Sequence, residues 1–180
     1  MIKIKALAGA LVMTGAAFLS QGAMAADVSN PDTALDLTSG ADYVGHMITG
    51  NHAGDTFTDK YTFTLTGSST VVGDLLSYTG NAKNGLDITN LALYGTSGLL
   101  LTGTQVSTGA TDIWQLSSAT LGAGDYYLAV SGSAVSKSAG SYSLGVTVTP
   151  VPEPETYAML LGGLGLMGVV ARRRKQSGNA

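Results

Sequence analysis

Asp59 is the residue whose type and position most directly suggest chemistry. In the stretch FTDKYTFTLT (residues 57–66) it shares one face with aromatic and aliphatic side chains. A buried and unpaired carboxylate is costly, so Asp59 must be protonated, paired, hydrogen-bonded or close to the rim of the core. One interpretation makes it a Ca²⁺ ligand together with Asp55 and loop carbonyls. The other, which we favour, is a carboxylate near a strand's start that accepts backbone N–H bonds, because no loop has EF-hand spacing.

The other chemistry-bearing residues match no known catalytic or metal-binding pattern. His46 and His52 lie six residues apart without an HExxH motif, and the chain has no cysteine, which disfavours a zinc site. The sequence also lacks a GxSxG nucleophile elbow and a P-loop. We therefore expect no enzyme, no catalytic residue and no cofactor-binding residue. Calcium is the one cofactor left open, and a hydrolase with aspartate catalysts is the least favoured alternative.

Short strands must position these residues. In residues 57–66, Phe57, Tyr61, Phe63 and Leu65 join Asp59 on one face, and threonines dominate the other. Residues 124–132 and 140–150 repeat the alternation. Further strands are expected at residues 69–78, 88–94, 99–101 and 112–116, separated by clusters of Gly, Asn and Asp. With no amphipathic helix between residues 27 and 150, the pattern predicts an all-β, antiparallel, jelly-roll-like β-sandwich over residues 26–150.

The charge of this central region limits its partners. Residues 27–150 contain ten Asp, three Lys and no Glu or Arg. A nucleic-acid partner requires clustered cations, so nucleic-acid binding is not expected. The only tryptophan, Trp114, has two interpretations. It is either a platform on which a sugar ring stacks or, as we favour, an aromatic residue of the core or its rim.

The N-terminal 25 residues are typical of a secretory signal peptide. Lys3 and Lys5 precede an apolar stretch from residue 6 to 19, and a short polar turn follows. Ala23 and Ala25 then supply the small-x-small pattern of a cleavage site, which predicts cleavage after Ala25 and export across the inner membrane.

The C-terminal segment, residues 151–180, has three parts in a fixed order. Pro152, Glu153 and Pro154 come first, and residues 156–171 follow without a charge. As a helix those 16 residues would span about 24 Å, against a hydrocarbon core of about 30 Å. We predict a short transmembrane helix whose cytoplasmic end carries the cluster of Arg172, Arg173, Arg174 and Lys175.

These three parts resemble the PEP-CTERM sorting signal of Gram-negative bacteria that make exopolysaccharide. The resemblance implies an exosortase-like membrane protease or transpeptidase as partner, with the sorting motif at residues 152–154. Two further resemblances concern the body of the chain. Phe57, Asp59 and Tyr61 match the F-x-D-x-[FY] signature of a subgroup of such proteins, and residues 121–148 are similar to the last hairpin of bacterial pre-peptidase C-terminal domains.

The resulting expectation is an exported, non-catalytic surface or biofilm-matrix protein associated with exopolysaccharide. It would be held transiently at the inner membrane by its C-terminal helix, cut near residues 152–154, and then released or attached at the cell surface. The alternative is a carbohydrate- or calcium-binding module on the same surface.

Overall fold

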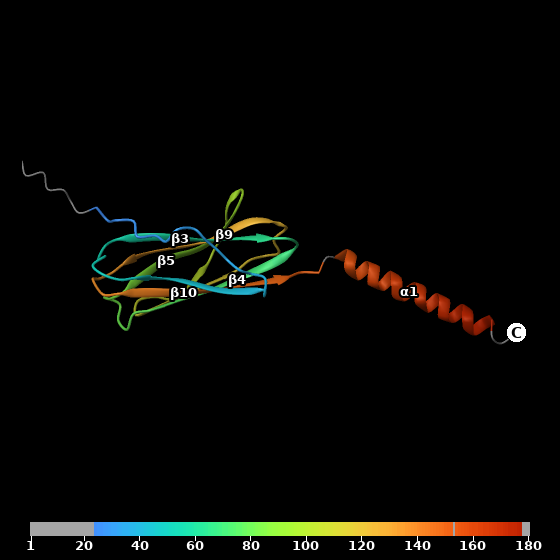
Figure 1. Cartoon of the computed structure of the whole chain (residues 1–180). Coiled ribbons are helices and arrows are strands. Elements are labelled where there is room, and N and C mark those ends of the chain that lie inside the picture. Colours follow the sequence, from blue (N-terminus) through green and yellow to red (C-terminus); the bar gives the residue numbers. More distant parts are fainter. Residues whose placement is uncertain (1–23, 153, 178–180) are drawn as a thin grey trace, which may run out of the picture.

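The computed structural model describes residues 24–152 and 154–177. The predicted signal peptide up to Ala23, and Glu153 of the predicted sorting motif, therefore lie outside the described residues. Ten strands form two sheets that face one another, and a single helix follows them (Figure 1). The fold is the β-sandwich that the sequence predicts.

Each sheet has five strands. The first sheet has the order β1-β3-β9-β5-β6 and the second the order β2-β10-β4-β8-β7. All strand pairs are antiparallel except β1 with β3. The strands are β1 (Thr33–Ala34), β2 (Ala41–Ile48), β3 (Thr56–Leu65), β4 (Ser69–Tyr78), β5 (Leu86–Gly95), β6 (Gly98–Thr102), β7 (Thr104–Ser107), β8 (Thr111–Ser117), β9 (Gly124–Ala134) and β10 (Gly140–Pro150).

The seven strands expected from the sequence are all present, whereas β1, β2 and β7 were not predicted. β2 has large apolar side chains on both faces, so its sequence shows no clear alternation. Its large apolar side chains Tyr43 and Met47 face solvent, with 79 % and 69 % of their surface exposed. Its half-buried positions include Asp42 and His46. Because Val44 and Ile48 share this inward face while large apolar side chains also lie on the outer one, hydrophobic periodicity does not mark the buried face of this strand.

The core lies between the sheets and is built from one face of each long strand. On β3 the alternation is as predicted, since Phe57, Asp59, Tyr61, Phe63 and Leu65 are all buried. Trp114 is 7 % exposed, and its indole N–H donates to the carbonyl of Ile88 at 3.1 Å. The core interpretation of Trp114 is confirmed, and a buried ring cannot serve as a sugar platform.

The helix α1 (Pro154–Ser177) follows the last strand and projects away from that end of the sandwich (Figure 1). It confirms the predicted C-terminal helix but runs on through the basic cluster. In the described ranges no helix is long and apolar enough to cross a membrane, contrary to the span predicted for residues 156–171. The physical reason is that this stretch holds only 16 uncharged residues, four of them glycine, between Glu155 and Arg172.

Candidate functional site

A buried hydrogen-bond network surrounds the carboxylate of Asp59, whose exposed fraction is zero. One oxygen, Oδ1, accepts the backbone N–H of Asn30 at 2.6 Å. The other, Oδ2, lies 2.8 Å from Nδ1 of His46 and accepts the hydroxyl of Tyr142 at 2.5 Å. The hydroxyls of Tyr142 and Tyr61 are 2.7 Å apart. The carboxylate is thus buried with partners on both oxygens, as a buried charge must be.

This network joins the two sheets. Asp59 and Tyr61 lie on β3 of the first sheet, whereas His46 on β2 and Tyr142 on β10 belong to the second. The segment before β1 contributes the N–H of Asn30. The structural interpretation of Asp59 therefore holds in a fuller form, because two side chains from the facing sheet supplement the backbone N–H that the sequence predicts.

Aromatic rings enclose the network on the side of Phe57. Its ring stacks on that of Tyr142 with centroids 5.8 Å apart, and it meets His46 edge-on at 6.0 Å. Gly132 on β9 makes room for it, since a Cβ atom there would lie 2.7 Å from Cζ of Phe57 and 2.4 Å from the carbonyl oxygen of Asp87. All three positions of the F-x-D-x-[FY] pattern thus face the same buried site. Phe57 packs over it, Asp59 is its hydrogen-bond acceptor, and the hydroxyl of Tyr61 is hydrogen-bonded to that of Tyr142.

The contact between His46 and Asp59 has the form of a histidine oriented by a carboxylate through Nδ1. A catalytic arrangement also needs a nucleophile within hydrogen-bond reach of Nε2. Within the described part of the chain, no hydroxyl is hydrogen-bonded to that nitrogen. Sequence reasoning named His46 only as a weak zinc candidate, and missed Tyr142 as a partner, because neither residue is close to Asp59 in the chain.

Asp55 lies in the loop before β3 and has partners different from those of Asp59. Its Oδ1 accepts the backbone N–H of Ala26 at 2.8 Å, and its Oδ2 lies 2.9 Å from Nδ1 of His52. The N–H of Ala26, followed by the hydrogen bond to His52, holds the pKa of Asp55 below its ordinary value. The two calcium candidates share no protein partner, and the residues described contain no group of three or more His, Asp or Glu that could hold a metal.

Burial also sets the protonation of the two tyrosines. It raises the pKa of Tyr61 to about 12. Burial, followed by the hydrogen bond to Asp59, raises the pKa of Tyr142 still further above its ordinary value. Both hydroxyls are therefore neutral donors at physiological pH.

We expect these two tyrosines to resist ionisation until the fold opens. Because their folded-state pKa values exceed the ordinary value of about 10, ionisation favours the unfolded chain. The stability they contribute is present below about pH 10 and falls as the pH rises from 10 through 12. Tyrosinate absorbance should thus show a late phase, coincident with unfolding by circular dichroism, that accounts for two of the eight tyrosines. Tyr142→Phe should halve that phase; ionisation of Tyr61 and Tyr142 before unfolding would contradict their burial.

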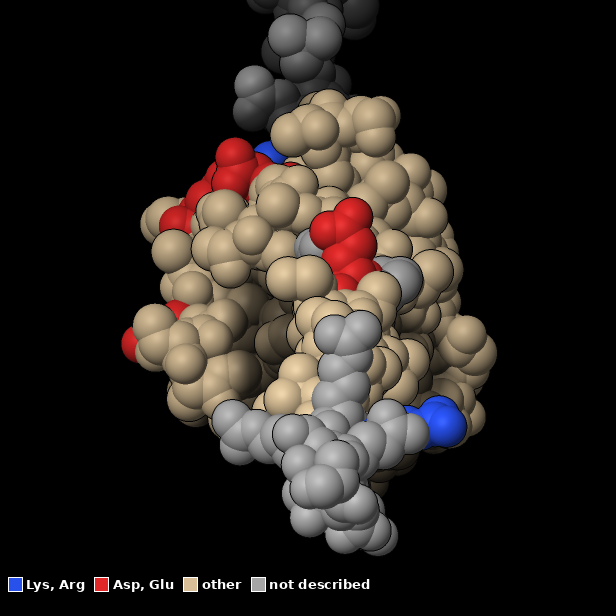
Figure 2. Space-filling model, turned by 90° about the vertical axis from the view of Figure 1, so that its right-hand side faces the viewer, with Lys and Arg blue, Asp and Glu red and all other residues tan. Residues whose placement is uncertain are grey.

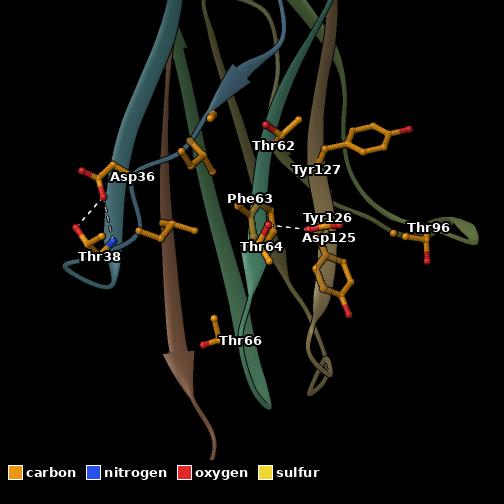
Figure 3. A pocket seen from close by; sticks show the side chains of 14 residues that line it. Asp36, Thr38, Thr62, Phe63, Thr64, Thr66, Thr96, Asp125, Tyr126 and Tyr127 are labelled. Atoms are coloured by element: carbon orange, nitrogen blue, oxygen red, sulfur yellow. Dashed lines mark hydrogen bonds between the residues drawn. The ribbon is translucent and has the colours of Figure 1, made fainter.

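A separate groove of about 900 Å³ opens beside the first sheet (Figure 3). It combines two carboxylates, several hydroxyls and aromatic rings. Asp125 accepts the hydroxyl of Thr64 at 2.7 Å, and Asp36 likewise accepts that of Thr38. The rings of Tyr126 and Tyr127, neighbouring residues of β9, lie at the edge of the groove. The side chains lining it include Leu35, Asp36, Thr38, Thr62, Phe63, Thr64, Thr66, Thr96, Asp125, Tyr126 and Tyr127.

The C-terminal motif begins where the sandwich ends. Pro150 pairs with Ser69 as the last residue of β10, and the N–H of Val151 donates to the carbonyl of Ser68 at 2.8 Å. Pro152 is exposed, and α1 starts at Pro154. Figure 2 views the molecule from the side on which α1 lies in Figure 1, and among the coloured residues Asp and Glu cover more of this face than Lys and Arg. The motif is therefore an exposed junction between a packed domain and an isolated helix.

Comparison with known protein families identifies this junction. Residues 150–175 match the family described as the PEP-CTERM protein-sorting motif. The chain carries a PEP-CTERM sorting motif. The match includes Pro152, Pro154 and the four cations from Arg172 to Lys175, as the sequence predicts. A PEP-CTERM motif implies recognition by an exosortase, with export and processing at the membrane. No curated protein matches this chain.

Two solved structures resemble this chain at low identity. One is the pre-peptidase C-terminal domain of a collagenase from Bacillus anthracis, with 18 % identity, a TM-score of 0.36, and coverage of 70 % of this chain and 95 % of that one. The other is PliG of Aeromonas hydrophila, a periplasmic inhibitor of g-type lysozyme, with 16 % identity, a TM-score of 0.38, and coverage of 69 % and 100 %.

Proposed function

We propose that this chain is an exported, non-catalytic protein of the cell surface or extracellular matrix. An exosortase-like enzyme cuts it near Pro152–Pro154, and the released sandwich associates with exopolysaccharide. The observation that carries the proposal is the sorting motif at residues 150–175, which begins at the last residue of the last strand.

The local geometry at the junction supports cleavage there. The hydrogen bond of Val151 to Ser68 is the last one that the structure gives between this end of the chain and the sandwich. Pro152 has no N–H with which to extend the sheet, and a proline disfavours helix in the residue before it. Both effects favour an extended backbone ahead of each proline, which is the conformation that a protease binds.

The test is the intact mass of the protein recovered from cells with and without the exosortase-like enzyme. With the enzyme, we expect a secreted or surface form that lacks the residues after the cleavage point. Without it, the chain should keep its C-terminus through Ala180 and stay in the cell fraction. A secreted form that still carries residues 157–180 would contradict the proposal.

The groove favours a second candidate function, carbohydrate binding by the same domain. Sugar sites combine an aromatic surface with a few well-placed polar groups. Tyr127 stacks on Tyr94 with centroids 4.8 Å apart, and Asp125 lies on the same strand. Calorimetry with the polysaccharide of the producing organism should give heat that Tyr127→Ala abolishes and Tyr43→Ala, on the other sheet, does not. No heat and no thermal shift would remove this candidate.

A further inference from the structure

The N-terminal end of the fold is anchored at Ala26. Its carbonyl oxygen accepts the N–H of Thr56 at 3.0 Å, and the N–H of Val28 donates to the carbonyl of Thr56 at 2.9 Å. Asp27 thereby forms an isolated parallel bridge with Thr56, at the start of β3. The backbone nitrogen of Ala26 itself points to a side chain, Oδ1 of Asp55, at 2.8 Å.

Ala26 is also the residue that cleavage after Ala25 would make the first of the mature chain. Before cleavage its nitrogen is an amide that donates one N–H. After cleavage the same atom is an α-ammonium group with a positive charge, because an α-amine has an ordinary pKa of about 7.7–8.0. The hydrogen-bond acceptor 2.8 Å from this nitrogen is Oδ1 of the Asp55 carboxylate.

We propose that Asp55 is the binding site for the α-ammonium group of the mature chain. Removal of the signal peptide turns a hydrogen bond into a salt bridge and fastens the N-terminal segment to the start of β3. This inference rests on the export part of the proposed function, through the cleavage after Ala25.

The surroundings of Asp55 suit this role. Its own N–H donates to the carbonyl of His52, and its carbonyl accepts the N–H of Ala134, both at 2.9 Å, so its backbone is fixed from two sides. Its second oxygen is held by His52, which leaves Oδ1 for the new terminus. Only 19 % of the Asp55 side chain is exposed. A charged donor strengthens a hydrogen bond whose acceptor is already in place.

The contact of Ala26 with Asp55 is connected to the hydrogen-bond network around Asp59. The hydroxyl of Ser29 accepts the N–H of Thr58 at 2.7 Å, and the next N–H, that of Asn30, donates to Asp59. Residues 26–30 therefore run from one carboxylate to the other along β3. Fixing Ala26 at Asp55 holds in place the segment that supplies one of the hydrogen bonds of buried Asp59.

The test compares protein beginning at Ala26 with protein beginning at Met24, in which Ala26 keeps its amide. Each is made with and without Asp55→Asn. The titratable groups facing the terminus are Asp55 and His52 of the loop and Asp27 of its own segment, whereas the end of β9 that packs there, residues 133–134, has none. Asp27→Asn is the matched control, because the carboxylate of Asp27 is bonded to Ser29.

In protein beginning at Ala26, NMR titration should place the α-amine pKa about 0.5 to 1 above its ordinary value. Asp55→Asn should restore the ordinary value, and Asp27→Asn should leave most of the rise. Asp55→Asn should also lower the Tm by about 1–4 °C more in this protein than in protein beginning at Met24.

Two results would overturn the inference, and they are distinguishable. An ordinary α-amine pKa together with equal Tm losses in both proteins would show that Asp55 acts only as an amide acceptor. An exported chain whose mass shows a first residue other than Ala26 would break the link to maturation. Neither result depends on whether the C-terminal motif is processed.

Discussion

Asp59→Ala is expected to lower the free energy of unfolding by about 3 to 5 kcal/mol. The reason is that the substitution leaves three groups without their acceptor, namely the buried hydroxyl of Tyr142 and the partly buried N–H of Asn30 and ring of His46. Removing one partner of a buried charged network costs about this much, since the remaining polar groups stay desolvated. Urea unfolding followed by circular dichroism measures the loss, and the slope of the transition checks that it stays two-state.

Asp125→Ala is the matched control for this substitution. Asp125 also lies on a strand of the first sheet and accepts one hydroxyl, that of Thr64, but it faces solvent. We expect a change within about 0.5 kcal/mol there, as is usual for surface positions. Equal losses at the two positions would show that the buried network does not stabilise the sandwich.

Neutralising the four cations from Arg172 to Lys175 with glutamine is expected to abolish sorting. The cations lie within the matched motif, and each Lys or Arg near an anionic leaflet is worth about 1 kcal/mol of attraction. Losing four weakens the approach to the membrane by about 4 kcal/mol, or roughly three orders of magnitude in occupancy. Fractionation followed by immunoblotting should find the full-length chain and no released form.

Gln176→Ala supplies the control for the cation variant. Gln176 is in the same helix, one residue beyond the matched segment, and its replacement leaves the charge unchanged. Sorting should proceed as in the native chain. If the glutamine variant were also sorted normally, the basic cluster would have no part in recognition, and the interpretation of the C-terminal segment would fail.

Local sequence determined seven of the ten described strands and the sorting motif. The period-two alternation of residues 57–66 places Asp59 on the buried face, because side chains alternate across a strand whatever it packs against. The sorting motif can also be recognised from the sequence, because its prolines, apolar stretch and cations follow one another along the chain. The membrane span predicted for this segment was wrong, because a spanning helix must be apolar enough as well as long enough.

Tertiary structure alone decided what surrounds the carboxylates. The partners of Asp59 lie 13, 29 and 83 positions away in the chain; His46 and Tyr142 reach it only when the two sheets stack, and Asn30 only when its segment lies along β3. β2, which carries His46, has large apolar side chains on both faces, so its sequence does not reveal which face is buried. The contact of Ala26 with Asp55 likewise joins residues 29 positions apart. Local periodicity indicates the buried face of a strand such as β3, but the group that meets a buried side chain depends on which strands pair and how the sheets face one another.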